Sequence, residues 1–126
     1  MKRNNKFEKE AKVILTHWIQ SLGLAPYTIR IDGILPDEEN PDGKASFDID
    51  VRYPYRIAYL RYSRRVVELW EDGSSIKDGL LHEALHILVA PLAKAAEERY
   101  ATEQSIEVAE EGVVDHLTEL FLPIIK

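Results

Sequence analysis

The chain has 126 residues, a formal net charge of −6 and no cysteine, and its length suits one domain, so we expect residues 1–126 to form a single domain. The absence of cysteine excludes disulfides, thiolate zinc sites and cysteine nucleophiles, so any metal must be held by histidine and carboxylate. The acidic balance argues against a general nucleic-acid binder or an anionic-membrane binder.

The start of the chain lacks the pattern of a signal or membrane segment. Residues 1–6 are basic, but charged residues at positions 8, 9, 10 and 12 interrupt any apolar run that could follow. No stretch approaches the roughly 18 apolar residues of a membrane helix. We therefore expect no membrane association and a cytoplasmic location, which is the host cytoplasm if the gene belongs to a phage.

Apolar periodicity in the first half predicts one helix and about three strands. The helix is expected over Phe7–Leu22, with Gly23 at its C-terminal end. Alternating residues predict strands over 27–31, 47–53 and 56–62, and a Pro-, Gly- and acid-rich loop over 35–44. The last two strands can form a hairpin or a meander. The segment 64–70 fits either a strand or a short helix.

The second half is predicted to be helical. Residues 75–78 have the form of a capping box, with Asp in place of Glu or Gln, and open a helix expected to run to Ala90, where Pro91 interrupts it. A helical segment over 92–104 and an amphipathic helix over 105–122, ended by Pro123, complete the chain. The order predicts an α+β fold with a small three-stranded sheet whose one face is covered by helices.

The segment His82-Glu83-Ala84-Leu85-His86 contains the main candidate functional residues. Residues four apart on a helix lie on one face, so His82 and His86 can converge on one tetrahedral ion. Glu83 lies about 100° around the helix from His82, within reach of a water beside that ion. This is the HExxH arrangement of metalloproteases, with two ligands and a general base. The structural alternative is two surface histidines that merely share a helix face.

Such a site needs a third protein ligand, which we expect on the final amphipathic helix. Glu110 lies nearest the centre of the apolar stripe, where an acid is costly unless it is paired or metal-bound. Glu111 lies off this centre, but Asp115 stands one turn further on, where a second acid can contact a ligand histidine. Glu107 is a third candidate. The residues themselves leave Glu110 and Glu111 both open.

The HExxH segment, followed by Glu111-Gly112-Val113-Val114-Asp115, resembles the gluzincin metallopeptidases. In that family, Glu-x-x-x-Asp follows HExxH one helix later, and here Glu111 follows His86 by 25 residues. The resemblance implies a minimal zincin-like domain. By the same resemblance, His82, His86 and Glu111 would bind Zn²⁺. Glu83 would be the catalytic base, and Asp115 would orient the first histidine. Glu110 remains the alternative third ligand.

Most of the chain also resembles small phage-type metallopeptidase-like proteins. The shared segments are Leu22-Gly23-Leu24, Tyr27-Thr28-Ile29-Arg30-Ile31, Tyr55-Arg56-Ile57-Ala58, residues 82–91 (HEALHILVAP) and residues 111–117 (EGVVDHL). Of these, the two helical segments are the specific ones.

The function predicted from these features is hydrolysis of peptide bonds in a peptide or protein substrate. A metal-activated water attacks the carbonyl, and Glu83 takes its proton and passes it to the leaving amine. Tyr100 or an arginine is a candidate for stabilising the oxyanion. The alternative is a non-catalytic zinc-binding phage accessory or protein-interaction domain, which has no need of Glu83. Because the chain is short for a peptidase, we expect its substrate cleft to be shallow, or to be completed by a partner protein or by self-association.

A second feature is the segment 52–65, which contains five arginines and four tyrosines. Interleaved aromatic and basic residues can bind nucleic acid by stacking and phosphate contact. The structural alternative is a half-exposed sheet whose tyrosines pack and whose arginines pair with Asp48 and Asp50. The acidic chain favours the structural alternative. A third hypothesis is that this strand borders the cleft and pairs with an extended peptide substrate.

Overall fold

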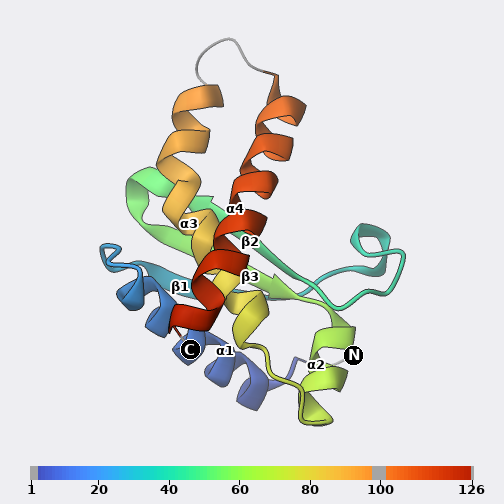
Figure 1. The fold of residues 1–126 in the computed structure, drawn as a ribbon. Coiled ribbons are helices and arrows are strands. Elements are labelled where there is room, and N and C mark those ends of the chain that lie inside the picture. The colour runs from blue at the N-terminus through green and yellow to red at the C-terminus, as the bar shows by residue number, and fades with distance from the viewer. Residues whose placement is uncertain (1–2, 98–101, 126) are drawn as a thin grey trace.

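In the computed structural model, which describes residues 3–97 and 102–125, the first element is helix α1, Asn5–Ser21 (Figure 1). The Oδ1 atom of Asn4 caps it by accepting a hydrogen bond from the backbone N–H of Phe7 at 3.0 Å. Apolar residues spaced by three or four are buried along one face, as predicted. Gly23, with φ of +72°, follows the helix in the left-handed conformation that glycine adopts without strain.

Three strands form one sheet in the order β1–β3–β2. β2 (Phe47–Arg52) and β3 (Ile57–Tyr62) form a hairpin, one of the two predicted alternatives, and the short 3₁₀ helix η2 (Tyr53–Tyr55) connects them. β1 (Thr28–Ile34) lies on the other side of β3 and runs parallel to it. β2 is therefore an edge strand, and its outer edge is free of strand partners among the described residues.

The segment 64–70, for which the sequence left two alternatives, is helical. Helix α2 spans Arg64–Glu71 and begins at Ser63, whose Oγ accepts a hydrogen bond from the backbone N–H of Val66. The loop between β1 and β2 contains the 3₁₀ helix η1 (Asp37–Glu39). Two arginine contacts, Arg61 to Glu39 at 2.7 Å and Arg64 to Asp37 at 3.2 Å, attach this loop to β3 and α2.

Helix α3 spans Lys77–Glu97 and continues through Pro91, so the prediction that it stops at Ala90 is wrong. Proline in a helix interior costs about 3 kcal/mol, and α3 nevertheless stays helical beyond it to Glu97 (Figure 1). At the start of α3, Ser75 Oγ accepts a hydrogen bond from the backbone N–H of Lys77. In a capping box the donor would be the next residue, Asp78. The predicted helical segment 92–104 is in part the continuation of α3, and residues 98–101 lie outside the described ones.

Helix α4 spans Glu103–Ile125 and packs beside α3, so the two form a helical hairpin (Figure 1). The prediction that Pro123 ends this helix is wrong, because Pro123 lies within its last turn. A proline so close to the end removes one backbone donor where few helical bonds remain to be made. In the described part of the chain, no helix combines the length and the apolar character that crossing a membrane requires.

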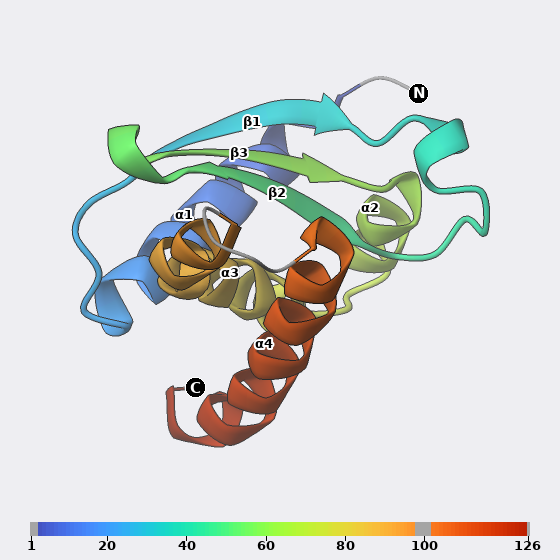
Figure 2. The same ribbon diagram turned by 90° about the horizontal axis from the view of Figure 1, so that it is seen from above.

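Helices α1 and α3 lie on the same side of the sheet, and α4 lies on the far side of α3 from α1 (Figure 2). Residues Leu80, Leu81, Ala84 and Leu85 of α3 are completely buried in the core. The indole N–H of Trp18 donates a hydrogen bond to the carbonyl oxygen of Lys77, which joins α1 to the start of α3. The polar side of α3 therefore faces the space between β2 and α4.

The two faces of α1 provide a test of this packing. Leu15 is fully buried, whereas Val13, on the same helix, is 63% exposed. Leu15→Ala should lower the free energy of unfolding by about 2–5 kcal/mol, because it leaves a cavity in the core. Val13→Ala should change it by no more than about 0.5 kcal/mol. Urea unfolding measures both, and equal effects would contradict the assigned orientation of α1.

Candidate metal centre

The two histidines of the HExxH segment lie side by side on the polar side of α3. Their ring centroids are 5.0 Å apart. The flanking Leu81 and Leu85 are fully buried, so the core fixes the rotation of the helix and directs both rings toward α4. The spacing of four residues thus produces the convergence that the sequence predicts.

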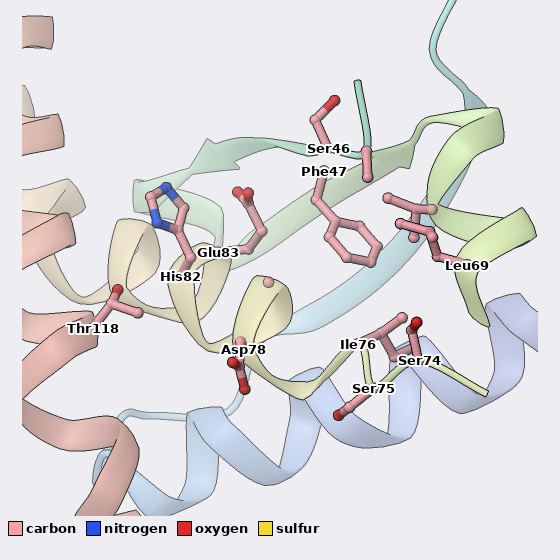
Figure 3. A pocket seen from close by; sticks show the side chains of 13 residues that line it. Ser46, Phe47, Leu69, Ser74, Ser75, Ile76, Asp78, His82, Glu83 and Thr118 are labelled. Carbon is pink, nitrogen blue, oxygen red and sulfur yellow. The ribbon is translucent and has the colours of Figure 1, made fainter. Parts of the chain in front are cut away.

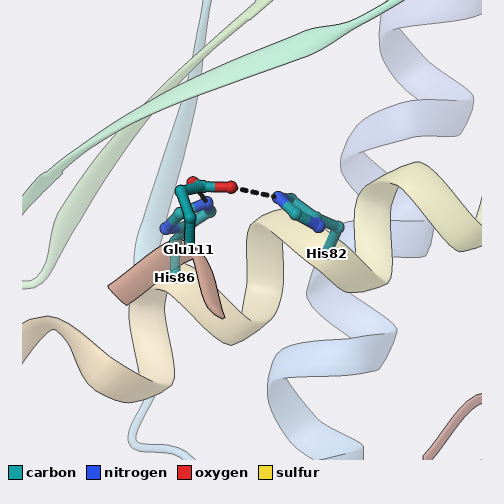
Figure 4. A group of neighbouring side chains, drawn as sticks. All are labelled: His82, His86 and Glu111. Atoms are coloured by element: carbon teal, nitrogen blue, oxygen red, sulfur yellow. Dashed lines mark ion pairs between the residues drawn. The ribbon is translucent and has the colours of Figure 1, made fainter. Parts of the chain in front are cut away.

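Glu111 of α4 lies between the two histidine rings (Figure 4). Its Oε1 is 2.8 Å from Nε2 of His86, and its Oε2 is 3.6 Å from Nε2 of His82. A tetrahedral zinc ion with bonds of about 2.0–2.1 Å requires ligand atoms separated by about 3.4 Å. One ligand atom from each of the three residues lies within 4.8 Å of the other two. Two imidazoles and one carboxylate are a donor set that zinc accepts, so the residues fit this ion.

The other ring nitrogen of each histidine faces a different carboxylate of α4. Asp115 Oδ1 is 3.5 Å from Nδ1 of His82, and Glu110 Oε1 is 3.3 Å from Nδ1 of His86. The two candidates for third ligand therefore contact His86 on opposite ring nitrogens, because adjacent residues of a helix point about 100° apart. Only Glu111, of these two, also reaches His82 in the described contacts.

Glu83 is a buried carboxyl group beside this cluster. Its side chain is 5% exposed and borders a cavity that also reaches His82. Burial raises the pKa of Glu83 well above its ordinary value, and the negative charges of Asp48 and Glu111 raise that pKa further. A carboxylate whose proton affinity is raised in this way is a stronger base than an exposed glutamate.

Two cavities of about 480 and 500 Å³ lie on either side of the histidine pair, and strand β2 borders both. The first is next to Glu83, and its wall includes Phe47, Leu69 and Ile76 (Figure 3). Gly79 on α3 also borders it, and a Cβ there would lie 3.0 Å from the Phe47 ring. The second borders His86 and Glu110, and it includes Glu107, the third ligand candidate.

Other polar residues lie away from this cluster. His17, a third histidine of the chain, is exposed on α1, where it contacts Ser21 at 3.4 Å. Tyr100, a candidate for stabilising the oxyanion, lies outside the described residues. The sequence predicts Asp48 only as a partner of the arginines, and it gives no sign that the charge of Asp48 acts on Glu83.

Four of the five arginines of segment 52–65 form ion pairs with acidic residues in the described part of the chain. Arg61 contacts Asp48 across the β2–β3 hairpin at 2.8 Å, and Arg52 contacts Asp50 on its own strand at 3.0 Å. Tyr62 is buried, and its hydroxyl donates a hydrogen bond to Glu8 at 2.5 Å. Tyr55 is largely exposed. Most of these contacts therefore agree with the hypothesis that the tyrosines pack and the arginines pair with Asp48 and Asp50. The Arg52 pair differs in that both residues lie on one strand.

No protein-family model, curated protein or solved structure matches the chain. What this cluster can do is therefore inferred from its own geometry and chemistry.

The raised pKa of Glu83 has a consequence for stability. In the metal-free protein, ionisation of Glu83 should destabilise the fold as the pH rises above the unfolded-state pKa of about 4.3. Glu83→Gln should therefore have nearly the stability of the wild type at pH 4 and below, and exceed it increasingly toward pH 8. Urea unfolding across this range measures the difference, with Glu119→Gln on the exposed side of α4 as the matched control. A difference that does not change with pH would contradict the burial of an ionisable carboxyl.

Proposed function

We propose that the chain is a zinc-dependent metallopeptidase in which His82, His86 and Glu111 hold the ion and Glu83 is the general base. The single observation that supports it most is the buried carboxyl of Glu83 beside a cluster of two imidazoles and one carboxylate. A structural zinc site has four protein ligands, whereas a catalytic site has three and an open position. A structural site has no need of a base, and burial of a carboxyl beside other negative charges costs stability.

The residues supply the groups that hydrolysis of an amide requires. A zinc ion bound to the cluster would polarise a carbonyl oxygen and lower the pKa of water. The Glu83 carboxylate accepts a proton from the attacking water as the new C–O bond forms. It then donates that proton to the amide nitrogen as the C–N bond breaks, so that the products are a carboxylic acid and an amine, which ionise to carboxylate and ammonium at neutral pH. The raised pKa of Glu83 suits both transfers, because the carboxyl must gain and lose a proton near neutral pH.

Strand β2 offers a binding edge for an extended peptide. The backbone N–H of Ser63 donates to the carbonyl oxygen of Ser46 at 3.0 Å. The carbonyl of Ser46 thus points toward β3, and the backbone groups of every second residue after it do the same. The backbone groups of the residues between them, Phe47, Ile49 and Val51, point to the free edge of β2. An extended substrate can add to that edge as a further strand, which would bring its backbone past the histidines between the two cavities.

The cavity beside Glu83 provides room for a substrate side chain. Its volume of about 480 Å³ lies in the range of small-ligand pockets, and Phe47, Leu69 and Ile76 make its wall apolar. A large apolar side chain that packs against these three residues loses its contact with water, which favours binding. We therefore expect cleavage next to Phe or Leu.

The role of Glu83 is tested by substitution with an isosteric amide. Glu83→Gln should bind zinc as the wild type does and lower kcat/KM by about 10²–10⁴-fold, because it loses the proton acceptor. His82→Ala should lose both zinc and activity. Mass spectrometry of a random peptide library and metal analysis of the same samples give the two readouts. Cleavage by Glu83→Gln at the wild-type rate would refute its role, and no cleavage by the zinc-loaded wild type would refute the function.

The apolar cavity is tested by changing its charge. Leu69→Asp should lower kcat/KM about 10-fold or more for peptides with Phe or Leu beside the cleaved bond, and favour Lys in their place. Val13→Asp, the same kind of change at an exposed position of α1, should leave the cleavage profile unaltered. Thermal melting checks that both variants fold. A folded Leu69→Asp protein with the wild-type profile would show that this cavity does not bind substrate.

A further inference from the structure

Glu110 lies against the Nδ1 side of the His86 ring. Each histidine directs Nε2 toward Glu111 and Nδ1 toward an acid of its own, Asp115 for His82 and Glu110 for His86. When Nε2 binds a metal, Nδ1 is the nitrogen that retains the proton, and an acceptor there fixes the tautomer and the ring orientation. Helix α4 thus provides an acceptor for each ring.

The two acceptors differ in their surroundings. Glu110 is 24% exposed and lies near the fully buried Val114, whereas Asp115 is 67% exposed. The contact between His86 Nδ1 and Glu110 has the geometry of a hydrogen bond at 3.3 Å, while Asp115 lies 3.5 Å from His82. Water competes less for a half-buried acceptor, and a less exposed charge is screened less.

The same geometry separates Glu110 from Glu111. The two carboxylates are neighbours on α4, yet Glu111 contacts Nε2 of His86 at 2.8 Å and Glu110 contacts Nδ1 of the same ring at 3.3 Å. A group on the Nδ1 side of a ring cannot bind an ion held by Nε2 of that ring. Glu110 therefore acts on the ion only through His86.

From these contacts we propose that Glu110 is a positioning residue, which holds His86 with Nδ1 protonated and Nε2 free for the metal. This inference rests on the proposed zinc site. Of the two acceptors, Glu110 contributes more to metal affinity than Asp115. The gluzincin resemblance alone would select Asp115 as the acid that orients a ligand histidine.

The test is the zinc dissociation constant, measured by competition with a chromophoric chelator. Glu110→Ala should weaken zinc binding by about 10–100-fold, the range expected for loss of a partner to a ligand histidine. Asp115→Ala should weaken it less. Glu110→Gln should restore most of the affinity, because its amide oxygen still accepts a hydrogen bond from Nδ1–H. Glu119→Ala, which removes an exposed acid from the same helix, is the matched control and should bind as the wild type does.

The absorption spectrum of the cobalt-substituted protein distinguishes a positioning residue from a ligand. Glu110→Gln should have the wild-type cobalt bands, because the set of atoms around the ion is unchanged, whereas Glu111→Ala should alter or abolish them. Altered bands in Glu110→Gln would make Glu110 a ligand and overturn the proposal. Wild-type affinity in Glu110→Ala, or a larger loss in Asp115→Ala, would also overturn it. Failure of the wild type to bind zinc would instead refute the site on which the inference rests.

Discussion

Burial of one side of α3 is the constraint on which the site depends. Leu80, Leu81, Ala84 and Leu85 are completely enclosed by the core, so the helix cannot rotate without exposing several large apolar side chains. Each such side chain contributes about 1.5–3 kcal/mol on burial, and their sum fixes the direction of the remaining face. His82 and His86 are therefore held toward α4 by packing forces that do not involve the histidines. A metal ion would meet two rings that are already oriented, and little side-chain entropy would be lost on binding.

Among the described residues, the carboxylates that contact these rings come from helix α4, at positions 110, 111 and 115. Acids so close together on one helix repel one another, and that repulsion is relieved when cations or hydrogen-bond donors face them. The imidazoles of α3 provide those donors, so the polar contacts and the apolar contact through Val114 favour the same docking of α4. Since an ion bound to the native fold stabilises it by mass action, zinc should strengthen the attachment of α4 to α3.

The sequence predicts the helical part of the site well, because a period of 3.6 residues determines which side chains share a face. It places His82 and His86 together and restricts the third ligand to α4. It cannot choose between Glu110 and Glu111, because that choice depends on how α4 is rotated against particular ring nitrogens of another helix. The run through Pro91 was missed because proline usually ends a helix, whereas α3 stays helical through Pro91 to Glu97. The parallel pairing of β1 and the cavity beside Glu83 both join residues far apart in the chain, and no local pattern encodes them.

In the proposed site, two histidines of α3 and one carboxylate of α4 hold a single zinc ion. X-ray absorption at the zinc edge of the loaded protein is the sharpest test, because the fine structure reports ligand type, number and distance. We expect four light-atom ligands at about 2.0–2.1 Å, two of them with the outer-shell scattering of imidazole. Glu111→Ala should lose one protein oxygen from this shell and keep both imidazoles, whereas Glu110→Gln should leave the shell as it is. A wild-type spectrum without two imidazoles, or with the six oxygens of a hydrated ion, would contradict the account.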